Sequence, residues 1–228
     1  MVEIRQKIED VNKTIQDAAN KKGHDPSNIN LIAVTKTVDM HKIEKAIECG
    51  VTDIGENKVQ ELLEKYDHLK DKVKWHMIGH LQKNKVKYIV DKVDLIHSLD
   101  SYELALEINK RAKKIDRKVS CLLQVNVSNE TTKFGVKSHE AVDLMYVLDK
   151  LTHVKIKGLM TMAPYVKDKE DTRKYFKSLK ELSKEISKHK LQNIEMEYLS
   201  MGMSNDFDIA IEEGANLVRV GSAIFGKR

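Results

Sequence analysis

The stretch LIAVTK, residues 31–36, decides how the rest of the chain is interpreted. A short apolar run of this length is typical of a buried strand, and here it ends on a lysine. Partial burial lowers the pKa of a lysine and enlarges its neutral fraction, and the neutral amine is the form that attacks a carbonyl carbon. The simpler interpretation is that Lys36 ends the strand and points out of the sheet towards solvent. The run alone leaves both interpretations open.

Similar short segments recur along the chain, separated by stretches with helical spacing of apolar residues. We predict strands over 29–35, 52–55, 75–79, 94–98, 119–127, 154–161, 194–199 and 217–220. A helix over 2–22 precedes the first of them. Eight mostly apolar strands alternating with helices predict one α/β domain over 1–228, a (β/α)8 TIM-type barrel with an extra N-terminal helix. An open doubly wound sheet is the alternative, but no GxGxxG motif follows the first strand.

Several helix ends can be read from capping residues. Asp39 is a predicted N-cap for a helix that stops at Gly50. Asp100 with Glu103 has the spacing of a capping box. The helix before the last strand is predicted over 204–213.

Composition restricts the kind of protein. Of 228 residues, 41% are apolar and 33% are charged, with a net charge of +5, which fits a water-soluble protein with a mixed-sign surface. The densest basic stretch, 110–118, contains no aromatic residue for base stacking, so a solvated helix face is favoured and no nucleic-acid partner is expected. No apolar run approaches the ~18 residues that span a bilayer, so no membrane association is expected.

The N-terminus and the cysteines indicate the compartment. The first ten residues carry several charges and do not resemble a signal peptide. Cys49 and Cys121 belong to no motif, as in proteins of a reducing compartment. We therefore expect a cytoplasmic protein.

The predicted carboxyl ends of the strands carry polar or small residues, and in TIM-type barrels the chemistry lies at these ends. The loops after the last two strands often hold a phosphate in such barrels. Here those loops offer free backbone N–H groups at Gly202, Ser204, Gly221 and Ser222. Ordinary turn glycines and helix caps explain each of these residues separately, but together they favour a phosphate site.

A strand-end lysine and a phosphate site at one barrel mouth suggest a ligand with an aldehyde and a phosphate, and pyridoxal 5′-phosphate (PLP) has both. Arg219 could face the ring nitrogen and keep it unprotonated, which weakens the ring as an electron sink. Asn57 and Asn126 are explained as well by loop capping as by ligand contact. His76 and His80 would be roughly 13 Å apart on an extended chain, so no metal site is predicted.

Six blocks, in this order along the chain, resemble the pyridoxal-phosphate homeostasis proteins, also called the proline-synthetase co-transcribed type. They are AVTKT (33–37), DIGENKVQE (53–61), WHMIGHLQKNK (75–85), QVNVSNETTKFG (124–135), GLMTMAP (158–164) and LSMGMSNDFDIAIEEGANLVRVGSAIFG (199–226). The resemblance implies a barrel like the N-terminal domain of alanine racemase and a Schiff base between PLP and Lys36. It also implies Arg219 at the ring nitrogen and phosphate contacts from Ser200, Gly202, Ser204, Gly221 and Ser222. It implies, less directly, that Asn57, His80, Asn126 and Met162 line the pocket.

The sequence favours a carrier or regulator in PLP homeostasis over an enzyme. Racemisation needs an acid or base on each face of the substrate, and Lys36 supplies one face only. The given sequence ends soon after the last predicted strand, so we expect neither a second base nor a dimer-forming domain, and a monomer is predicted. A weakly active amino-acid racemase is the alternative, and a sugar-phosphate barrel enzyme with Lys36 as an aldolase-type lysine is a third reading. Whether apo forms of PLP enzymes are partners stays open.

Overall fold

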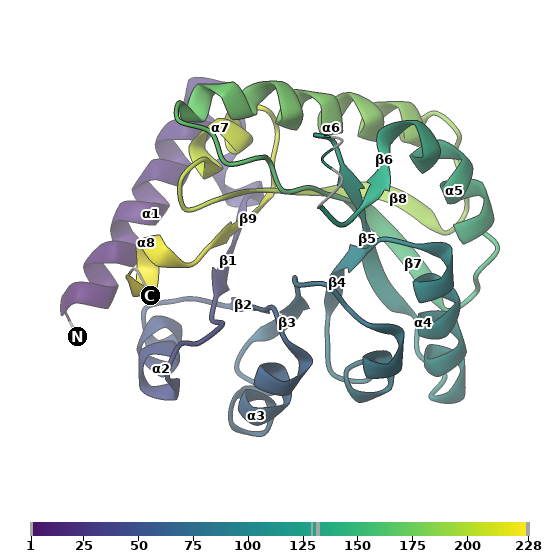
Figure 1. The fold of residues 1–228 in the computed structure, drawn as a ribbon. Helices are drawn as coiled ribbons and strands as arrows, with labels where there is room; N and C mark the ends of the chain where they lie inside the picture. The colour runs from purple at the N-terminus through teal and green to yellow at the C-terminus, as the bar shows by residue number, and fades with distance from the viewer. Residues whose placement is uncertain (1, 129, 131–132, 227–228) are drawn as a thin grey trace.

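The computed structural model describes residues 2–128, 130 and 133–226 (Figure 1). Part of the predicted 124–135 block and both ends of the predicted 1–228 domain therefore lie outside the described residues. Eight strands form the central sheet: β1 (Asn30–Val34), β2 (Asp53–Glu56), β3 (Lys74–Met77), β4 (Leu95–Leu99), β5 (Val119–Asn126), β7 (Val154–Met160), β8 (Ile194–Met203) and β9 (Leu217–Val220).

All neighbouring strands are parallel, and the sheet is closed. The strand order is β4-β3-β2-β1-β9-β8-β7-β5, and pairing of β4 with β5 joins the two edges. A short additional strand, β6 (Val136–Lys137), pairs with the end of β5 and was not predicted. The predicted TIM-type barrel is therefore confirmed, and the open doubly wound sheet is not formed.

Helices return the chain after the strands and surround the barrel (Figure 1). The α-helices are α1 (Val2–Lys21), α2 (Met40–Glu48), α3 (Val59–Leu69), α4 (Tyr102–Lys114), α5 (Ala141–Leu148), α6 (Arg173–Ser187), α7 (Phe207–Glu212) and α8 (Ser222–Phe225). The 3₁₀ helices are η1 (Pro26–Asn28), η2 (Lys83–Tyr88), η3 (Ser138–Glu140) and η4 (Lys169–Thr172). The crossover from β3 to β4 thus uses η2 where the other barrel crossovers use α-helices.

The extra N-terminal helix is present and packs beside α7 and α8 (Figure 1). Its buried stripe of Ile8, Val11 and Ile15 has the spacing of one helix face. At its C-terminal end, Lys21 Nζ donates to Glu212 Oε1 at 2.6 Å and ties the helix to α7. Helix α1 therefore covers the barrel wall next to β9.

Two helix starts differ from their predictions. The N-cap of α4 is Ser101, whose Oγ accepts from the Leu104 N–H, one residue after the predicted cap Asp100. Helix α7 begins at Phe207, three residues after the predicted start, because Asp206 Oδ1 accepts from the Met203 N–H at 2.7 Å and closes a turn there. The predicted cap at Asp39 is confirmed, since its carboxylate accepts from the Lys42 N–H at 3.0 Å.

The apolar residues form two separate buried clusters. The larger lies between the strands and the helices and includes Trp75 and Phe176. The smaller takes one residue from each of five barrel strands: Ile32, Leu95, Leu122, Met160 and Leu217. These side chains fill the barrel interior, so it is a packed core over which a site can be built.

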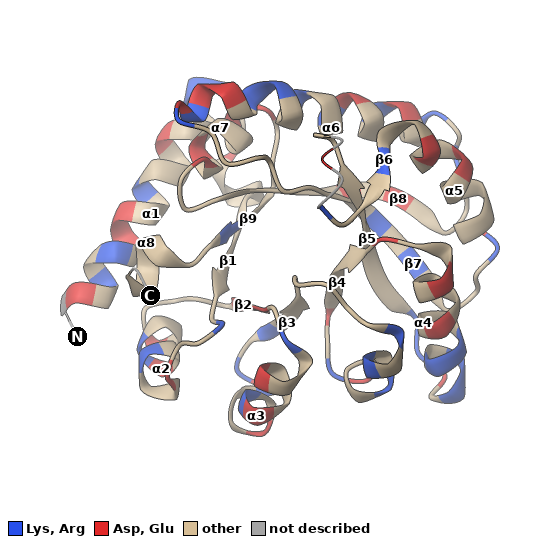
Figure 2. Ribbon diagram, in the orientation of Figure 1, with Lys and Arg blue, Asp and Glu red and all other residues tan. Residues whose placement is uncertain are grey.

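Charges of both signs are interleaved along α1, α3, α4 and α6 (Figure 2). Within the basic stretch 110–118, Arg111 pairs with Glu107, and Arg117 donates to the carbonyl oxygens of Val90 and Val93. These arginines support the local structure. In the described part of the chain no helix has the length and apolar character that a bilayer crossing requires.

Candidate functional site

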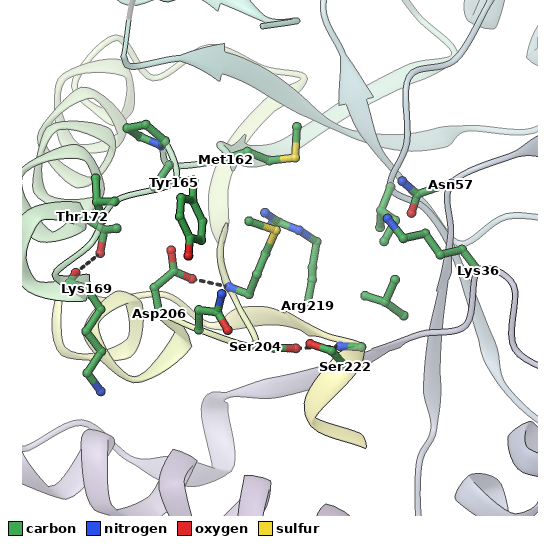
Figure 3. Close-up of a pocket in the computed structure, with 18 residues that line it drawn as sticks. Lys36, Asn57, Met162, Tyr165, Lys169, Thr172, Ser204, Asp206, Arg219 and Ser222 are labelled. Atoms are coloured by element: carbon green, nitrogen blue, oxygen red, sulfur yellow. Dashed lines mark hydrogen bonds between the residues drawn. The ribbon is translucent and has the colours of Figure 1, made fainter. Parts of the chain in front are cut away.

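A cavity of about 620 Å³ opens at the carboxyl ends of the barrel strands. In Figure 3, Lys36 and Asn57 lie on its right, Arg219 lies across from Lys36, and Ser204 and Ser222 lie along the bottom. Seven of the eleven residues predicted from the sequence line this cavity: Lys36, Asn57, Met162, Ser204, Arg219, Gly221 and Ser222.

Lys36 owes its direction to strand alternation. Val34 ends β1 and lines the cavity, and Lys36, two residues later, lies on the same side. Thr35 between them is fully buried and points the other way, towards the second strand. Lys36 is half-buried, so its amine reaches into the cavity from a fixed strand end.

A buried ion pair holds the backbone before Lys36. Thr35 Oγ1 donates to Glu56 Oε1 at 2.6 Å. Lys65 Nζ donates to the same carboxylate oxygen at 2.7 Å and to the Thr35 carbonyl oxygen at 2.7 Å. Burial raises the pKa of Glu56, and the Lys65 and Thr35 hydrogen bonds act against that rise. Strand β2 and helix α3 therefore fix the peptide that precedes Lys36.

The backbone after Lys36 is held as well. Thr37 has a φ of +56°, a left-handed conformation that costs a β-branched residue energy. Its N–H donates to Glu61 Oε2 at 2.6 Å, and Glu61 in turn lies 3.6 Å from Lys65 Nζ. Lys36 thus lies between Thr35 and Thr37. Both neighbours are restrained by the cluster of Glu56, Glu61 and Lys65.

Arg219 is the buried cation of the site. It is 4% exposed, and burial lowers its pKa to about 10, so it stays protonated at neutral pH. Its Nη1 donates to Ser200 Oγ, and its Nη2 donates to the Thr161 carbonyl oxygen at 2.9 Å. The carboxylate of Asp206 acts against the lowering. One acceptor on β8 and one directly after β7 therefore fix the plane of the guanidinium.

The loops after β8 and β9 meet through a hydroxyl. Ser204 Oγ accepts from the backbone N–H groups of Gly221 at 3.2 Å and Ala223 at 3.3 Å. Gly221 packs so closely on β1 that a Cβ there would lie 3.2 Å from Val34 Cβ. The two loops predicted to hold a phosphate are therefore in contact at one edge of the cavity, and the Gly221 N–H, which the sequence predicted to be free, already has a partner.

Gly202 shapes the first of these loops from outside the cavity lining. Its φ is +91°, and an added Cβ would lie 2.6 Å from Ala210 Cβ and 2.8 Å from Phe207 Cα. Only glycine fits both the backbone and the space. Gly202 thus contributes by letting the loop pass close to α7.

Asn57 contributes a polar atom without a partner. Its Oδ1 is buried and makes no hydrogen bond within the described residues, although the side chain borders the cavity beside Lys36 (Figure 3). A buried acceptor left unpaired is costly, so such an atom points to a donor on a ligand. The Asn57 backbone is held by contact with Gly79, where a Cβ would lie 2.3 Å from the Asn57 carbonyl oxygen.

Four predicted residues lie outside the cavity lining: His80, Asn126, Ser200 and Gly202. His80 Nδ1 lies 3.1 Å from Asp100 Oδ2, and its ring stacks on Phe134 with the centroids 3.9 Å apart. Asn126 Nδ2 donates to the Glu130 carbonyl oxygen at 2.8 Å, which is the loop-bracing role that the sequence left open.

Other residues line the cavity without having been predicted. Val34 precedes Lys36 by two residues, so strand alternation could have identified it, whereas Ile78 follows the end of β3 and precedes His80, which does not line the cavity. Tyr165, Asp206 and Lys169 come from the loops after β7 and β8, where no sequence signal marks them. Lys169 forms an ion pair with Asp208, and that hydrogen bond raises its pKa.

The arrangement suits an anion that also carries a carbonyl group. Lys36 offers an amine, Arg219 offers a buried positive charge, and the loops of Ser204 and Gly221 lie between them at the cavity edge. No group of three or more His, Cys, Asp or Glu side chains among the described residues could hold a metal ion. The residues present therefore fit a phosphorylated aldehyde such as PLP.

Comparison with known proteins gives consistent results. Residues 11–228 match the family model described as the alanine racemase N-terminal domain. A pyridoxal phosphate homeostasis protein of Aquifex aeolicus is 45% identical over 98% of this chain and 97% of its own length. An unknown protein from Bifidobacterium adolescentis is 34% identical, with a TM-score of 0.94 over 98% of this chain and 94% of that one. PipY of Synechococcus elongatus, in its structure with PLP bound, is 32% identical, with a TM-score of 0.81 over 93% of this chain and 100% of that one.

Proposed function

The chain belongs to the pyridoxal phosphate homeostasis proteins, a family built on the alanine racemase N-terminal domain, and on that premise we propose that it binds PLP covalently through Lys36. The observation that carries the proposal is the meeting of Lys36, Arg219 and the Ser204–Gly221 loops around one cavity. The relatives carry the PLP name, and one of them was solved with PLP bound.

Each side chain would have one task. The Lys36 amine would hold PLP through its aldehyde carbon, with the aldehyde oxygen leaving as water. Arg219 would donate to the ring nitrogen and keep it unprotonated, while Ser204 and Ser222 would hold the phosphate at the loop where the Gly221 N–H donates to Ser204 Oγ. Asn57 Oδ1 accepts a hydrogen bond from the ligand. When bound, PLP supplies an electron sink, which an unprotonated ring nitrogen weakens.

We infer a carrier or regulator in PLP homeostasis, without robust turnover. A second proton-transfer group must be held within hydrogen-bond reach of the transferred proton. Tyr165, the cavity residue that could serve, is 91% exposed and makes no hydrogen bond within the described residues. Asp206 is occupied by the Met203 N–H, and Lys169 by Asp208. Weak racemisation through Tyr165 is the alternative.

The test compares two lysines of one cavity. Wild-type protein, Lys36→Ala and Lys169→Ala are mixed with PLP, reduced with borohydride and analysed by absorbance and intact mass. We expect a reduced adduct of one PLP in the wild type and in Lys169→Ala, and none in Lys36→Ala, with unchanged circular dichroism. An adduct that persists in Lys36→Ala would refute the assignment. Amino-acid racemisation by wild type, lost in Tyr165→Phe, would favour the enzyme.

A further inference from the structure

An unbroken line of polar side chains crosses the interior of the barrel beneath the cavity. It begins at Asp53 on β2, whose Oδ1 lies 2.8 Å from His76 Nε2. His76 Nδ1, on β3, lies 2.9 Å from His97 Nε2, on β4. His97 Nδ1 lies 2.9 Å from Ser200 Oγ, on β8, and Arg219 Nη1, on β9, donates to the same hydroxyl oxygen.

These groups are almost fully removed from water. Ser200 and His97 are fully buried, and Asp53, the most exposed of the five, is 7% exposed. Burying so many polar groups is costly unless every donor and acceptor is paired. The proton positions must therefore satisfy all of them together.

Only one proton arrangement does so with a charged arginine, a charged aspartate and uncharged rings. A guanidinium only donates, so Ser200 Oγ accepts from Arg219 and passes its own proton towards His97 Nδ1. His97 then carries its proton on Nε2 and donates to His76 Nδ1. His76 carries its proton on Nε2 and donates to the Asp53 carboxylate. Burial, together with the positive charge of Arg219, lowers the pKa of His97 well below its ordinary value, which agrees with a neutral ring.

We propose that Asp53, His76, His97 and Ser200 are positioning residues for Arg219, acting as one directed hydrogen-bond relay. The Asp53 carboxylate fixes the tautomer of His76, and His76 fixes that of His97. His97 can then only accept from Ser200, so the lone pair of Ser200 is aimed at the guanidinium. With Thr161 holding Nη2, the relay fixes which N–H groups of Arg219 face the cavity.

The inference rests on the proposed function, because the group that Arg219 meets is taken to be the ring nitrogen of PLP. A purely structural role for the same residues would affect stability alone. A positioning role also changes PLP affinity and the absorption spectrum of bound PLP, although none of Asp53, His76, His97 and Ser200 lines the cavity.

The chain offers a matched control on the same barrel. Ser98 and Ser200 are both fully buried strand residues, but Ser98 Oγ makes no hydrogen bond within the described residues. Ser200→Ala and Ser98→Ala therefore remove the same atom from two equally buried strand positions, and only the first removal breaks hydrogen bonds. We expect Ser200→Ala to bind PLP about 10-fold more weakly, the range for losing a hydrogen bond to a charged group, with a shifted absorption maximum. We expect Ser98→Ala to match the wild type in both.

The second test changes the far end of the relay, and its first measurement needs no ligand. In ¹⁵N spectra of PLP-free protein, we expect His76 and His97 as neutral rings protonated on Nε2. In Asp53→Asn, which keeps the size of the side chain, we expect a mixture of tautomers and PLP binding several-fold weaker than that of wild type.

Different results would refute the relay and the proposed function. Ser200→Ala and Ser98→Ala with equal affinity and spectra, or a charged or Nδ1-protonated His97, would overturn the relay. If Ser200→Ala does not fold, Asp53→Asn decides in its place, and wild-type affinity in that variant overturns the proposal. A wild type that binds no PLP refutes the proposed function, while the nitrogen spectra still test the proton arrangement.

Discussion

Replacing Lys65 by methionine should destabilise the protein in a strongly pH-dependent way. The Lys65 side chain is 10% exposed and its partner Glu56 is fully buried, with 2.7 Å between Nζ and Oε1. Removing one partner of a buried ion pair leaves the other as an unpaired charge, which costs about 3–5 kcal/mol. The second carboxylate oxygen of Glu56 already makes no hydrogen bond within the described residues, so no other donor is ready to take the place of Lys65.

The sign of the pH dependence follows from Glu56. Burial raises its pKa above the ordinary 4.5 in the folded protein, and loss of Lys65 raises it further. Near pH 4 the carboxyl is protonated in the folded and unfolded states alike, so the variant is close to wild type. As the pH rises, the unfolded chain loses this proton before the folded one does, and the free energy of unfolding of the variant falls. We expect the deficit to grow from below about 1 kcal/mol at pH 4 to about 3 kcal/mol at pH 7.

Urea unfolding followed by circular dichroism at pH 4, 5, 6, 7 and 8 measures this deficit. Lys184→Met is the matched control, because Lys184 pairs with Glu181 at 2.8 Å with both side chains more than half exposed. An exposed pair contributes about 0–1 kcal/mol, so the control should show a small deficit that changes little with pH.

The double variant Glu56→Gln/Lys65→Met isolates the charge. It leaves no buried carboxylate to ionise, so it should regain at least about half of the stability lost by Lys65→Met at pH 7. A Lys65→Met deficit that is the same at pH 4 and pH 7, or a double variant no more stable than the single one, would show that Lys65 acts by packing. The ion-pair reasoning would then be wrong.

Three further predictions concern other parts of the molecule. Gly202→Ala should lower the free energy of unfolding by about 2–4 kcal/mol, because the new Cβ would overlap Ala210 and the backbone φ is +91°. Gly23→Ala, at a φ of +69° with open space around it, should lower it by about 1 kcal/mol, and urea titrations compare the two variants. Burial raises the pKa of the Cys121 thiol, so a thiol reagent should label the half-buried Cys49 alone until denaturant is added, and two equally fast thiols in native protein would contradict this. Arg173→Met should cost about 1–3 kcal/mol by removing ion pairs to three carboxylates, one of them buried, and calorimetry showing an unchanged melting temperature would count against it.

The strands could be predicted because each is a short apolar run, but their ends could not. Strand β8 extends to Met203, four residues past its predicted end, because its pairing with β9 holds Met203 opposite Arg219. Residues 200–203 include a glycine and a serine, which locally resemble a loop. Helix α7 begins three residues later than predicted, but β8 ends four residues later, so the loop between them is one residue shorter than expected. Local propensity cannot reveal this, because the partner strand supplies the hydrogen bonds.

Lys36 and Arg219 could be found from the sequence because they stand near strand ends, where polar residues interrupt apolar runs. The ion pairs of Lys65 that hold the backbone around Lys36 could not be predicted, because Lys65 lies on a helix that otherwise has ordinary amphipathic spacing. Its importance comes from Glu56 facing it, which depends on how α3 docks against β2. A helix lysine beside a buried carboxylate is indistinguishable in sequence from a surface lysine.

The relay could not be predicted from the sequence for a related reason. Strand register explains which strands it crosses. Ile32 on β1 is in register with Asp53 on one side and with Arg219 on the other, so the two charged ends of the relay are separated by a single strand. Two strand spacings amount to about 10 Å, close enough for attraction but too far for contact. Ile32 is fully buried and apolar, and it offers no hydrogen bond between them. The polar connection therefore runs the other way, through His76 and His97 and across the interior to Ser200, which only the closure of the barrel brings within reach.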